Sequence, residues 1–258
     1  MVSNELQAAL DAAEAAADVI RAHYGRGIGV HVKSDNSPVT EADMLAEKVI
    51  RETLSARFPT FGFYGEESGR HHMDAEAVWI VDPIDGTKCF VRDTPFFSTQ
   101  IALWRGGRAV LGVSSAPVYG ELAWAEEGAG AFMNGRPIRV SAITELSAAT
   151  VSFGNVKAIA RSEAWAGMRE LFERAYSTRG YGDFVHYHLL ARGALDAVIE
   201  SDLSIYDMAA LAVIVREAGG AFTDLEGGAL SLDTHTVLAS NGSPLHGELR
   251  DLIGRQCR

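Results

Sequence analysis

An apolar run that ends in two closely spaced carboxylates is the feature that most limits how this chain can fold. Residues 79–87 read Trp-Ile-Val-Asp-Pro-Ile-Asp-Gly-Thr. The apolar half is typical of a buried strand, and the proline and glycine that follow are typical of a turn. This order predicts a strand whose last residue and following turn project two acids into a cleft.

Two interpretations are open for Asp82 and Asp85 on this stretch alone. Carboxylate oxygens are ligands that Mg²⁺ prefers. Gly86 lets the backbone approach a ligand closely, and the amides after it can hold an anion. The first interpretation is therefore a metal site that handles phosphate. The second is a strand followed by an ordinary turn, in which Asp and Gly are common for local reasons.

Charge restricts the partners of the chain. The 258 residues are 47% hydrophobic and carry a formal net charge of -11. The length allows one large domain or two smaller ones, and the negative charge argues against a nucleic-acid partner. An anionic substrate would need local positive charge, which bound cations can supply.

Cysteine content and hydropathy indicate the compartment. The only two cysteines, Cys89 and Cys257, lie far apart in the sequence. We therefore expect no disulfide framework and a cytoplasmic location. We also expect neither a signal peptide nor a membrane span. The N-terminus has no basic region before an apolar one, and no apolar run approaches the roughly 20 residues that a span needs.

Helical periodicity and turn signals predict an α+β first half. Helices are expected at residues 3–24 and 40–57. The inward face of the second helix is expected to carry Leu45, Val49, Leu54 and Phe58. Strand-like segments follow at residues 61–64, 99–104, 108–114, 121–126 and 138–140. Glycine-containing turns separate the last four of these, which is typical of an antiparallel meander.

The second half alternates strands with helices. The strands are expected at residues 150–153, 197–200, 220–223 and 237–239, and the helices at 162–175, 183–192, 205–218 and 244–253. Alternation of this kind predicts a smaller α/β layer. We therefore expect two domains, residues 1–146 and 147–258. They should pack tightly, because no flexible linker separates them.

Acidic residues outside the central stretch extend the candidate site. They are Asp43, Glu66 with its neighbour Glu67, and Asp207. Each also has a local explanation. Asp43 fits a capping box with Thr40, the two glutamates fit a solvated turn, and Asp207 fits the N-terminus of a helix.

Three motifs, taken together, resemble those of a known family. They are Gly-Glu-Glu-Ser at 65–68, the Asp-Pro-Ile-Asp-Gly-Thr part of the central stretch, and Tyr-Asp-Met-Ala-Ala at 206–210 with Glu-Ala-Gly-Gly at 217–220. In this order and spacing the chain resembles the inositol monophosphatase family of Mg²⁺-dependent, lithium-sensitive phosphomonoesterases. The resemblance covers nearly the whole chain. It implies an α/β (α+β) fold, a layered α-β-α-β-α sandwich of the inositol monophosphatase and fructose-1,6-bisphosphatase type.

The resemblance implies a metal ligand set. Glu66, Asp82 and the carbonyl of Ile84 match ligands of a first metal, and Asp82, Asp85 and Asp207 match ligands of a second. Glu66 also matches a ligand of a third, weaker site. The implied cofactor is Mg²⁺, two to three ions per site, with Mn²⁺ as a substitute. Paired metals can stabilise both the attacking and the leaving oxygen of a displacement.

The same resemblance implies how water and phosphate are held. Asp43 and Thr87 match the pair that orients and activates the attacking water, with Glu66 beside them. The amides of Gly86 and Thr87 match the phosphate cradle. The family usually has Trp where this chain has Tyr206, and we expect metal binding to survive that change. The resemblance further implies a homodimer.

The identity of the phosphate ester rests on residues further along. Residues 179–184 read Arg-Gly-Tyr-Gly-Asp-Phe and resemble the histidinol-phosphate phosphatase branch. The candidate substrate contacts are Arg179, Asp183 and Glu200. Asp183 can pair with the ammonium group of histidinol, or it can simply cap the following helix. Glu200 matches the position where the inositol branch contacts its sugar, and it fits either substrate.

Other activities stay open at this stage. An inositol-1-phosphate phosphatase or a broad sugar or nucleotide phosphatase fits the same motifs, and a catalytically silent ligand-binding regulator is a remote alternative. His186 and His188 cannot share one helical face, so no zinc site is expected from them. The polar segment at residues 33–38 is a candidate loop that closes over the site.

Overall fold

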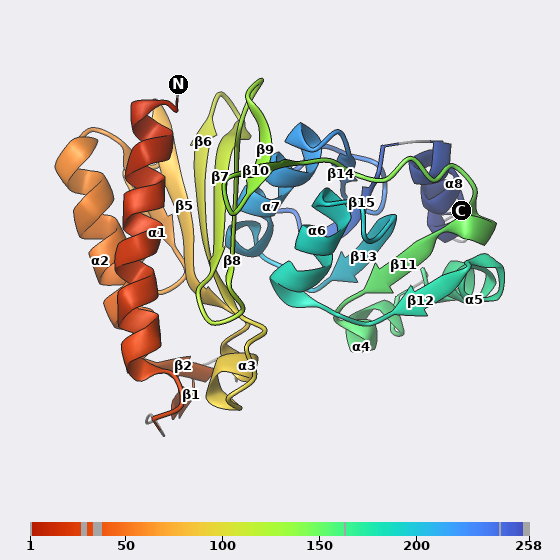
Figure 1. Ribbon diagram of the computed structural model, residues 1–258, viewed down its shortest axis with the longest axis horizontal. Coiled ribbons are helices and arrows are strands. Elements are labelled where there is room, and N and C mark those ends of the chain that lie inside the picture. Colours follow the sequence, from red (N-terminus) through yellow and green to blue (C-terminus); the bar gives the residue numbers. More distant parts are fainter. Residues whose placement is uncertain (1, 27–29, 33–37, 163, 243, 255–258) are drawn as a thin grey trace.

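The computed structural model describes residues 2–26, 30–32, 38–162, 164–242 and 244–254. Helices and sheets alternate in layers along the long axis of the molecule (Figure 1). Helices α1 and α2 cover an eight-stranded sheet, α6 and α7 lie between that sheet and a five-stranded sheet, and α5 and α8 cover the far side. The expected α-β-α-β-α order is confirmed. The segment expected to close over the site lies, apart from Pro38, outside the described residues.

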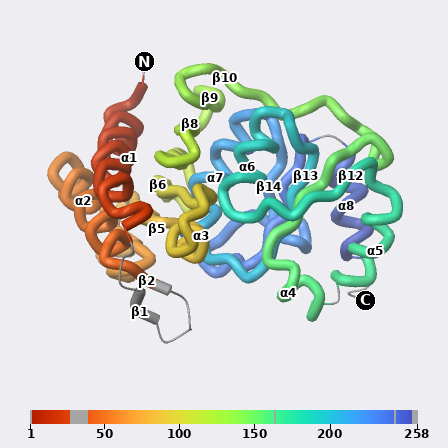
Figure 2. The backbone as a smooth tube through the Cα atoms, turned by 60° about the horizontal axis from the view of Figure 1, so that its bottom comes forward, coloured from red at the N-terminus to blue at the C-terminus, as the bar shows by residue number. Residues whose placement is uncertain are grey.

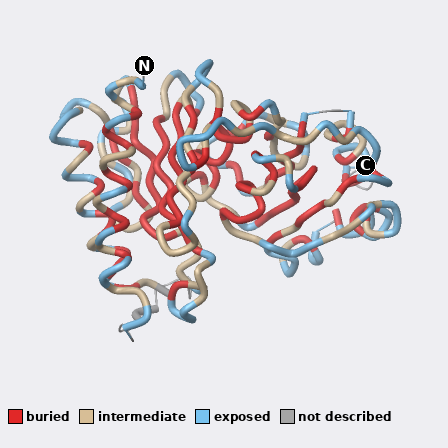
Figure 3. Tube along the Cα trace, viewed as in Figure 1, coloured by how far each residue is buried: buried red, intermediate tan, exposed pale blue. Residues whose placement is uncertain are grey.

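The outer helix α1 (Asn4–His23) is built to pack closely. The hydroxyl of Ser3 caps it by accepting the Leu6 amide at 3.0 Å, and the helix ends at Tyr24. Its buried face is mostly alanine: Ala8, Ala9, Ala12, Ala13, Ala16 and Ala17. Small side chains let the helix axis approach both α2 and strands β6 and β7. The red inner edge of this helix is visible in Figure 3.

The expected inward face of α2 (Glu41–Arg57) is confirmed in part, because Leu54 is fully buried and Phe58 packs against the same core. Leu45 and Val49 are only half-buried, whereas Asp43, Glu47 and Ile50 are buried. The prediction followed the large aliphatic residues. The helix instead turns two carboxylates inward, because each finds hydrogen-bond donors there.

The eight-stranded sheet has the order β10-β9-β8-β7-β6-β5-β3-β4. Its strands are β3 (Gly62–Gly65), β4 (Gly69–His71), β5 (Ala77–Asp85), β6 (Ser98–Arg105), β7 (Arg108–Ala116), β8 (Glu121–Glu126), β9 (Gly130–Met133) and β10 (Arg136–Ile138). All pairs are antiparallel except β3 with β5, so the expected meander is confirmed. The strand expected at 138–140 lies instead at β10, because Asn134 and Gly135 both have positive φ and close a tight hairpin with β9.

The second sheet has the order β12-β11-β13-β15-β14. Its strands are β11 (Thr150–Phe153), β12 (Ser177–Arg179), β13 (Ala197–Ser201), β14 (Ala221–Thr223) and β15 (Thr236–Ser240). A small third sheet pairs β1 (Val30–Val32) with β2 (Pro38–Thr40). The remaining helices are α3 (Thr87–Val91), α4 (Val156–Ile159), α5 (Trp165–Arg174), α6 (Asp183–Ala191), α7 (Ile205–Glu217), α8 (Pro244–Gly254) and a short 3₁₀ turn (Leu146–Ala148).

Helix α7 joins the two halves. It is apolar on nearly every side and buried, as expected for a helix between two sheets. It packs against β6, β7 and β8, although it belongs to the second half of the chain (Figure 2). The domain boundary at residue 146 therefore stays a prediction. None of the helices in the described ranges combines the length and apolar character needed to cross a bilayer.

Candidate metal centre and active site

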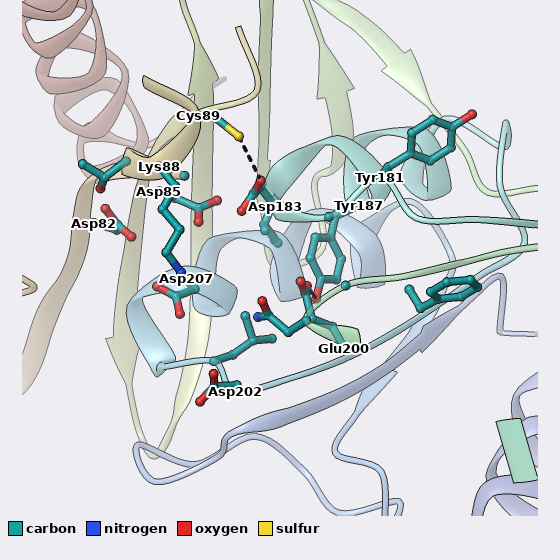
Figure 4. Close-up of a pocket in the computed structure, with 18 of the residues that line it drawn as sticks. Asp82, Asp85, Lys88, Cys89, Tyr181, Asp183, Tyr187, Glu200, Asp202 and Asp207 are labelled. Carbon is teal, nitrogen blue, oxygen red and sulfur yellow. Dashed lines mark hydrogen bonds between the residues drawn. The ribbon is translucent and has the colours of Figure 1, made fainter. Parts of the chain in front are cut away.

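A cleft of about 470 Å³ receives side chains from both halves of the chain (Figure 4). It is lined by the end of β5, by α3, by the first turns of α6 and α7, and by β13. Most of the predicted site residues meet here. Those that line the cleft are Glu66, Asp82, Ile84, Asp85, Gly86, Thr87, Asp183, Glu200 and Asp207.

Three carboxylates form the centre of the cleft. Asp82, Asp85 and Asp207 each offer an oxygen, and these atoms all lie within 4.8 Å of one another. Asp82 and Asp85 come from β5, and Asp207 comes from α7, more than a hundred residues later. The donor set is all oxygen, which suits a hard cation such as Mg²⁺.

The end of β5 is shaped to present both of its acids. The pairing register with β6 shifts between Asp82 and Asp85. The Ile84 amide donates to Asp82 Oδ1 at 2.9 Å, which makes a local Asx turn. The Thr99 hydroxyl donates to the Pro83 carbonyl at 2.8 Å. The turn and the carboxylates that could hold a metal thus belong to the same structure, so the two interpretations of this stretch are compatible.

Gly86 allows the chain to turn directly after the acids. Its φ of 88° is left-handed, and a Cβ there would lie 2.7 Å from the Phe96 carbonyl oxygen. Only glycine fits both conditions. The next residue, Thr87, begins α3 and donates its hydroxyl to the Ile84 carbonyl at 3.0 Å.

Asp43 lies on α2 directly behind Thr87, and it also caps that helix. It is buried and is not among the described residues that line the cleft, so it meets the site only through Thr87. Its Oδ2 accepts the amide and the hydroxyl of Thr40 at 2.8 and 2.6 Å. Its Oδ1 accepts the Thr87 hydroxyl at 3.3 Å. The structure therefore brings together the two residues predicted to orient water, and the capping box is real as well.

Glu66 is placed by the backbone of β5. It directly follows β3, and its amide donates to the Val81 carbonyl at 3.0 Å, one residue before Asp82. Burial, then the charge of Glu66, raise the pKa of Asp82 well above its usual value. Both carboxylates therefore belong to one electrostatic cluster, although the tight group of three does not include Glu66.

Burial and mutual repulsion of these carboxylates favour the binding of a cation by the cluster. Burial raises the pKa of Asp207 to about 7. Burial, and then the charge of Asp183, raise the pKa of Asp85 well above its usual value. Carboxylates whose charge is this unfavourable gain most from a bound cation. The residues present thus fit a divalent metal.

Asp183 lines the cleft at the first turn of α6. Gly182 is the N-cap of α6 and no side-chain cap bond is present, so the interpretation of Asp183 as a simple helix cap is wrong. Burial, then the charge of Glu200, raise the pKa of Asp183 to about 6. The thiol of Cys89 lies 3.9 Å from Asp183 Oδ2 (Figure 4).

Glu200 is held by α6. Its Oε2 is 2.9 Å from His186 Nε2 and accepts the Tyr187 hydroxyl at 2.8 Å. His188 points elsewhere, to Glu121 and Ser114, so the two histidines occupy different faces as expected.

The structure does not bring Arg179 to the cleft. Its side chain is exposed on β12 and donates to the Thr178 carbonyl, and it is missing from the described residues that line the cleft.

Sequence reasoning missed three residues at the site. Lys88 lines the cleft and supplies a positive charge that lowers the pKa of Asp183. The sequence signal for Lys88 was its position directly after Thr87. Cys89 contacts Asp183, and nothing in the sequence pairs Cys89 with Asp183 or Tyr187 with Glu200.

With this geometry in hand, comparison with known proteins identifies the family. A family model described as "Inositol monophosphatase family" matches residues 1–257. The chain belongs to this family. A relative from Chlorobaculum parvum named "Histidinol-phosphatase" is 40% identical over 240 residues, which cover 93% of each chain. The "Inositol-1-monophosphatase" of Rhizobium meliloti is 36% identical over 234 residues, which cover 89% of this chain and 88% of that protein.

A solved structure of the same family confirms the fold. The extragenic suppressor protein suhB from Bartonella henselae superimposes with a TM-score of 0.90 at 34% identity. The superposition covers 97% of this chain and 98% of that one. The inositol monophosphatase fold therefore extends over nearly the whole described chain.

Proposed function

We propose that this protein is a Mg²⁺-dependent phosphomonoester hydrolase, and that histidinol phosphate is its preferred substrate. The observation that carries the proposal is the position of Asp183, a carboxylate that faces the cleft beside the metal cluster and does not cap its helix. Membership of a family whose relatives are named as phosphatases supports the reaction class. Two to three ions would be bound, with Mn²⁺ as a substitute.

The residues that line the cleft support the metal ligands that the family resemblance implies. Glu66, Asp82 and the Ile84 carbonyl would hold one ion, and Asp82, Asp85 and Asp207 would hold another. When bound, the ions neutralise phosphate charge and make water easier to deprotonate. They also supply the positive charge that a protein of net charge -11 otherwise lacks.

The protein's own groups orient the attacking water. The Thr87 hydroxyl has a single proton and two acceptors within reach, the Ile84 carbonyl at 3.0 Å and Asp43 Oδ1 at 3.3 Å. Its oxygen can still accept a hydrogen bond from water. Asp43 holds that hydroxyl in place while its other oxygen is fixed by Thr40. The amides of Gly86 and Thr87 would bind the phosphate oxygens. Water then attacks directly, and no covalent intermediate on the protein is needed.

Charge complementarity favours histidinol over a polyol. Histidinol carries an ammonium group, and Asp183 on α6 and Glu200 on β13 both line the cleft. A charge-assisted hydrogen bond between ammonium and carboxylate is roughly twice as strong as a neutral one. The alternative is an inositol-1-phosphate phosphatase or a broader sugar or nucleotide phosphatase. The Rhizobium meliloti relative favours it, and Glu200 fits both substrates.

Phosphate release from a substrate panel tests this proposal. With Mg²⁺ present, histidinol phosphate should be hydrolysed more efficiently than inositol-1-phosphate, fructose-1,6-bisphosphate or 3′-phosphoadenosine-5′-phosphate. The variant Asp183→Asn should lose far more kcat/KM on histidinol phosphate than on glycerol phosphate, because only the former has a cation to pair. An equal loss on both esters would make Asp183 structural. Asp85→Asn should abolish turnover of every ester with the fold intact, and near-normal activity would refute the metal assignment.

Location and assembly complete the proposal. The cytoplasm is favoured because the chain has only two cysteines, Cys89 and Cys257, far apart in the sequence, and so offers no disulfide framework. A homodimer and sensitivity to lithium are what family membership implies.

A further inference from the structure

Glu47 is a buried carboxylate that the proposed reaction does not use. It lies on α2 one helical turn after Asp43, with only 4% of its surface exposed. It is absent from the described residues that line the cleft. A buried charge is costly unless it is paired or hydrogen-bonded. The hydrogen-bond partners of Glu47 therefore indicate its role.

The partners of Glu47 are two consecutive backbone amides. Its Oε2 accepts the Glu67 amide at 2.8 Å, and its Oε1 accepts the Ser68 amide at 2.8 Å. These amides directly follow Glu66. The turn that carries Glu66 is thus held on one side by the Val81 carbonyl of β5 and on the other by Glu47.

Gly65 leaves room for this carboxylate. A Cβ on Gly65 would lie 2.4 Å from Glu47 Oε2 and 2.5 Å from its Cδ. Real Cβ atoms do not approach that closely, so any larger residue would displace the carboxylate. Gly65, the glycine of the Gly-Glu-Glu-Ser motif, therefore leaves space for the Glu47 side chain of α2.

We infer that Glu47 is a positioning residue that sets the location of the Glu66 carboxylate relative to Asp82. The inference rests on the proposed function, because it matters only if Glu66 binds metal. Asp43 and Glu47 are four residues apart and share one face of α2. One helix face thus fixes two parts of the site, the water-orienting pair through Asp43 and a metal ligand through Glu47.

Metal affinity of Glu47→Gln tests this role. Glutamine keeps the size of the side chain, but its NH₂ group would face one backbone N–H. Groups that orient metal ligands typically cost about 10- to 100-fold in affinity when removed. Mn²⁺ binding to the metal-free protein, followed by the EPR signal of free Mn²⁺, should weaken by that factor. The kcat at saturating Mg²⁺ should recover to within a few-fold of wild type.

Glu217→Gln is the matched control. The Glu217 carboxylate also accepts two backbone amides, those of Gly128 at 3.0 Å and Gly130 at 2.9 Å, where β8 turns into β9, and none of these three residues is among the described residues that line the cleft. This variant should lose thermal stability without any change in Mn²⁺ affinity. Glu47→Asp separates charge from geometry, because it keeps the charge but is too short to reach both amides. It should bind Mn²⁺ as weakly as Glu47→Gln.

The outcomes distinguish this inference from the proposed function. Wild-type Mn²⁺ affinity in Glu47→Gln or in Glu47→Asp overturns the inference when Asp85→Asn has lost binding. Wild-type affinity in Asp85→Asn overturns the proposed function, and the inference falls with it. If Glu47→Gln does not fold, Gly65→Ala displaces the same carboxylate from the other side, and unchanged Mn²⁺ affinity in that variant also overturns the inference.

Discussion

Single carboxylates in this protein perform two tasks with their two oxygens. Asp43 caps α2 with Oδ2 and meets Thr87 with Oδ1. Asp207 accepts the Ser204 amide at 2.7 Å as part of a capping box, and it also joins the acidic group of three. Only the helix-terminal task has a local signature in the sequence, whereas the task at the candidate site was implied by the family resemblance. The sequence could not predict that Glu217, within a family motif, serves two backbone amides where β8 turns into β9.

The Tyr187 phenol and the His186 ring both hold the Glu200 carboxylate. Tyr187→Phe removes the 2.8 Å hydrogen bond to Glu200 Oε2 but keeps the ring packed against Phe222. Hydrogen bonds to charged groups contribute about 1.5–3 kcal/mol, so KM for histidinol phosphate should rise about tenfold. Mn²⁺ affinity should stay unchanged. Steady-state kinetics and EPR titration measure both, with Tyr176→Phe, at a residue 75% exposed, as the control. A loss of Mn²⁺ binding instead would place Tyr187 in the metal site.

At the scale of elements, local patterns predicted most helices and strands but not how one helix was turned. The expected face of α2 followed Leu45 and Val49, which are half-buried, and therefore overlooked Glu47. A charged residue is buried only when donors from elsewhere in the chain reach it. Those donors, the amides of Glu67 and Ser68, are twenty residues away and carry no signal for this contact. The packing of α7 against the eight-stranded sheet could not be predicted either, because it also joins distant parts of the chain.

Close packing of α7 on the first sheet should be essential for the metal site. A Cβ on Gly112 of β7 would lie 2.3 Å from the Ala210 carbonyl oxygen of α7. Gly112→Ala must therefore push away the helix that carries Asp207. Overpacking of this kind typically costs about 1–3 kcal/mol, and Mn²⁺ affinity should fall with it.

Urea unfolding and Mn²⁺ titration check this prediction. The control is Gly247→Ala on α8, where an added Cβ has nothing within 4 Å. That variant should be neutral or stabilised by about 0.5–1 kcal/mol, because alanine favours helix over glycine. Unchanged urea midpoint and Mn²⁺ affinity in Gly112→Ala would mean that α7 can shift without cost.

At the scale of the whole molecule, the cleft is where the two halves meet and where negative charge is concentrated. Asp82 and Asp85 come from the first half, whereas Asp183 and Asp207 come from the second. Folding therefore brings together carboxylates that repel one another in the absence of a cation. The same juxtaposition that allows metal binding should destabilise the metal-free protein.

The pKa of Asp207 determines whether the stability of the metal-free protein rises or falls with pH. The folded pKa of about 7 exceeds the ordinary value of 3.8. Between these values the folded protein binds more protons than the unfolded chain, so stability falls as the pH rises and the loss is complete above about pH 7. His188 and His246, whose pKa values are lowered by burial, act in the opposite direction below their ordinary value of 6.5. Wild type and Asp207→Asn share both histidines, so the difference in stability between the two proteins at each pH does not contain the histidine contribution.

Metal-free wild type and Asp207→Asn should therefore diverge as the pH rises. By differential scanning fluorimetry in EDTA, the melting temperature of the variant should exceed that of wild type more at pH 8 than at pH 5.5. Mg²⁺ should then raise the melting temperature of wild type, and more at pH 8, because protons compete with metal at the lower pH. The variant should gain much less. A melting-temperature difference that is the same at both pH values would mean that repulsion around Asp207 does not oppose folding, and that the metal is not needed to relieve it.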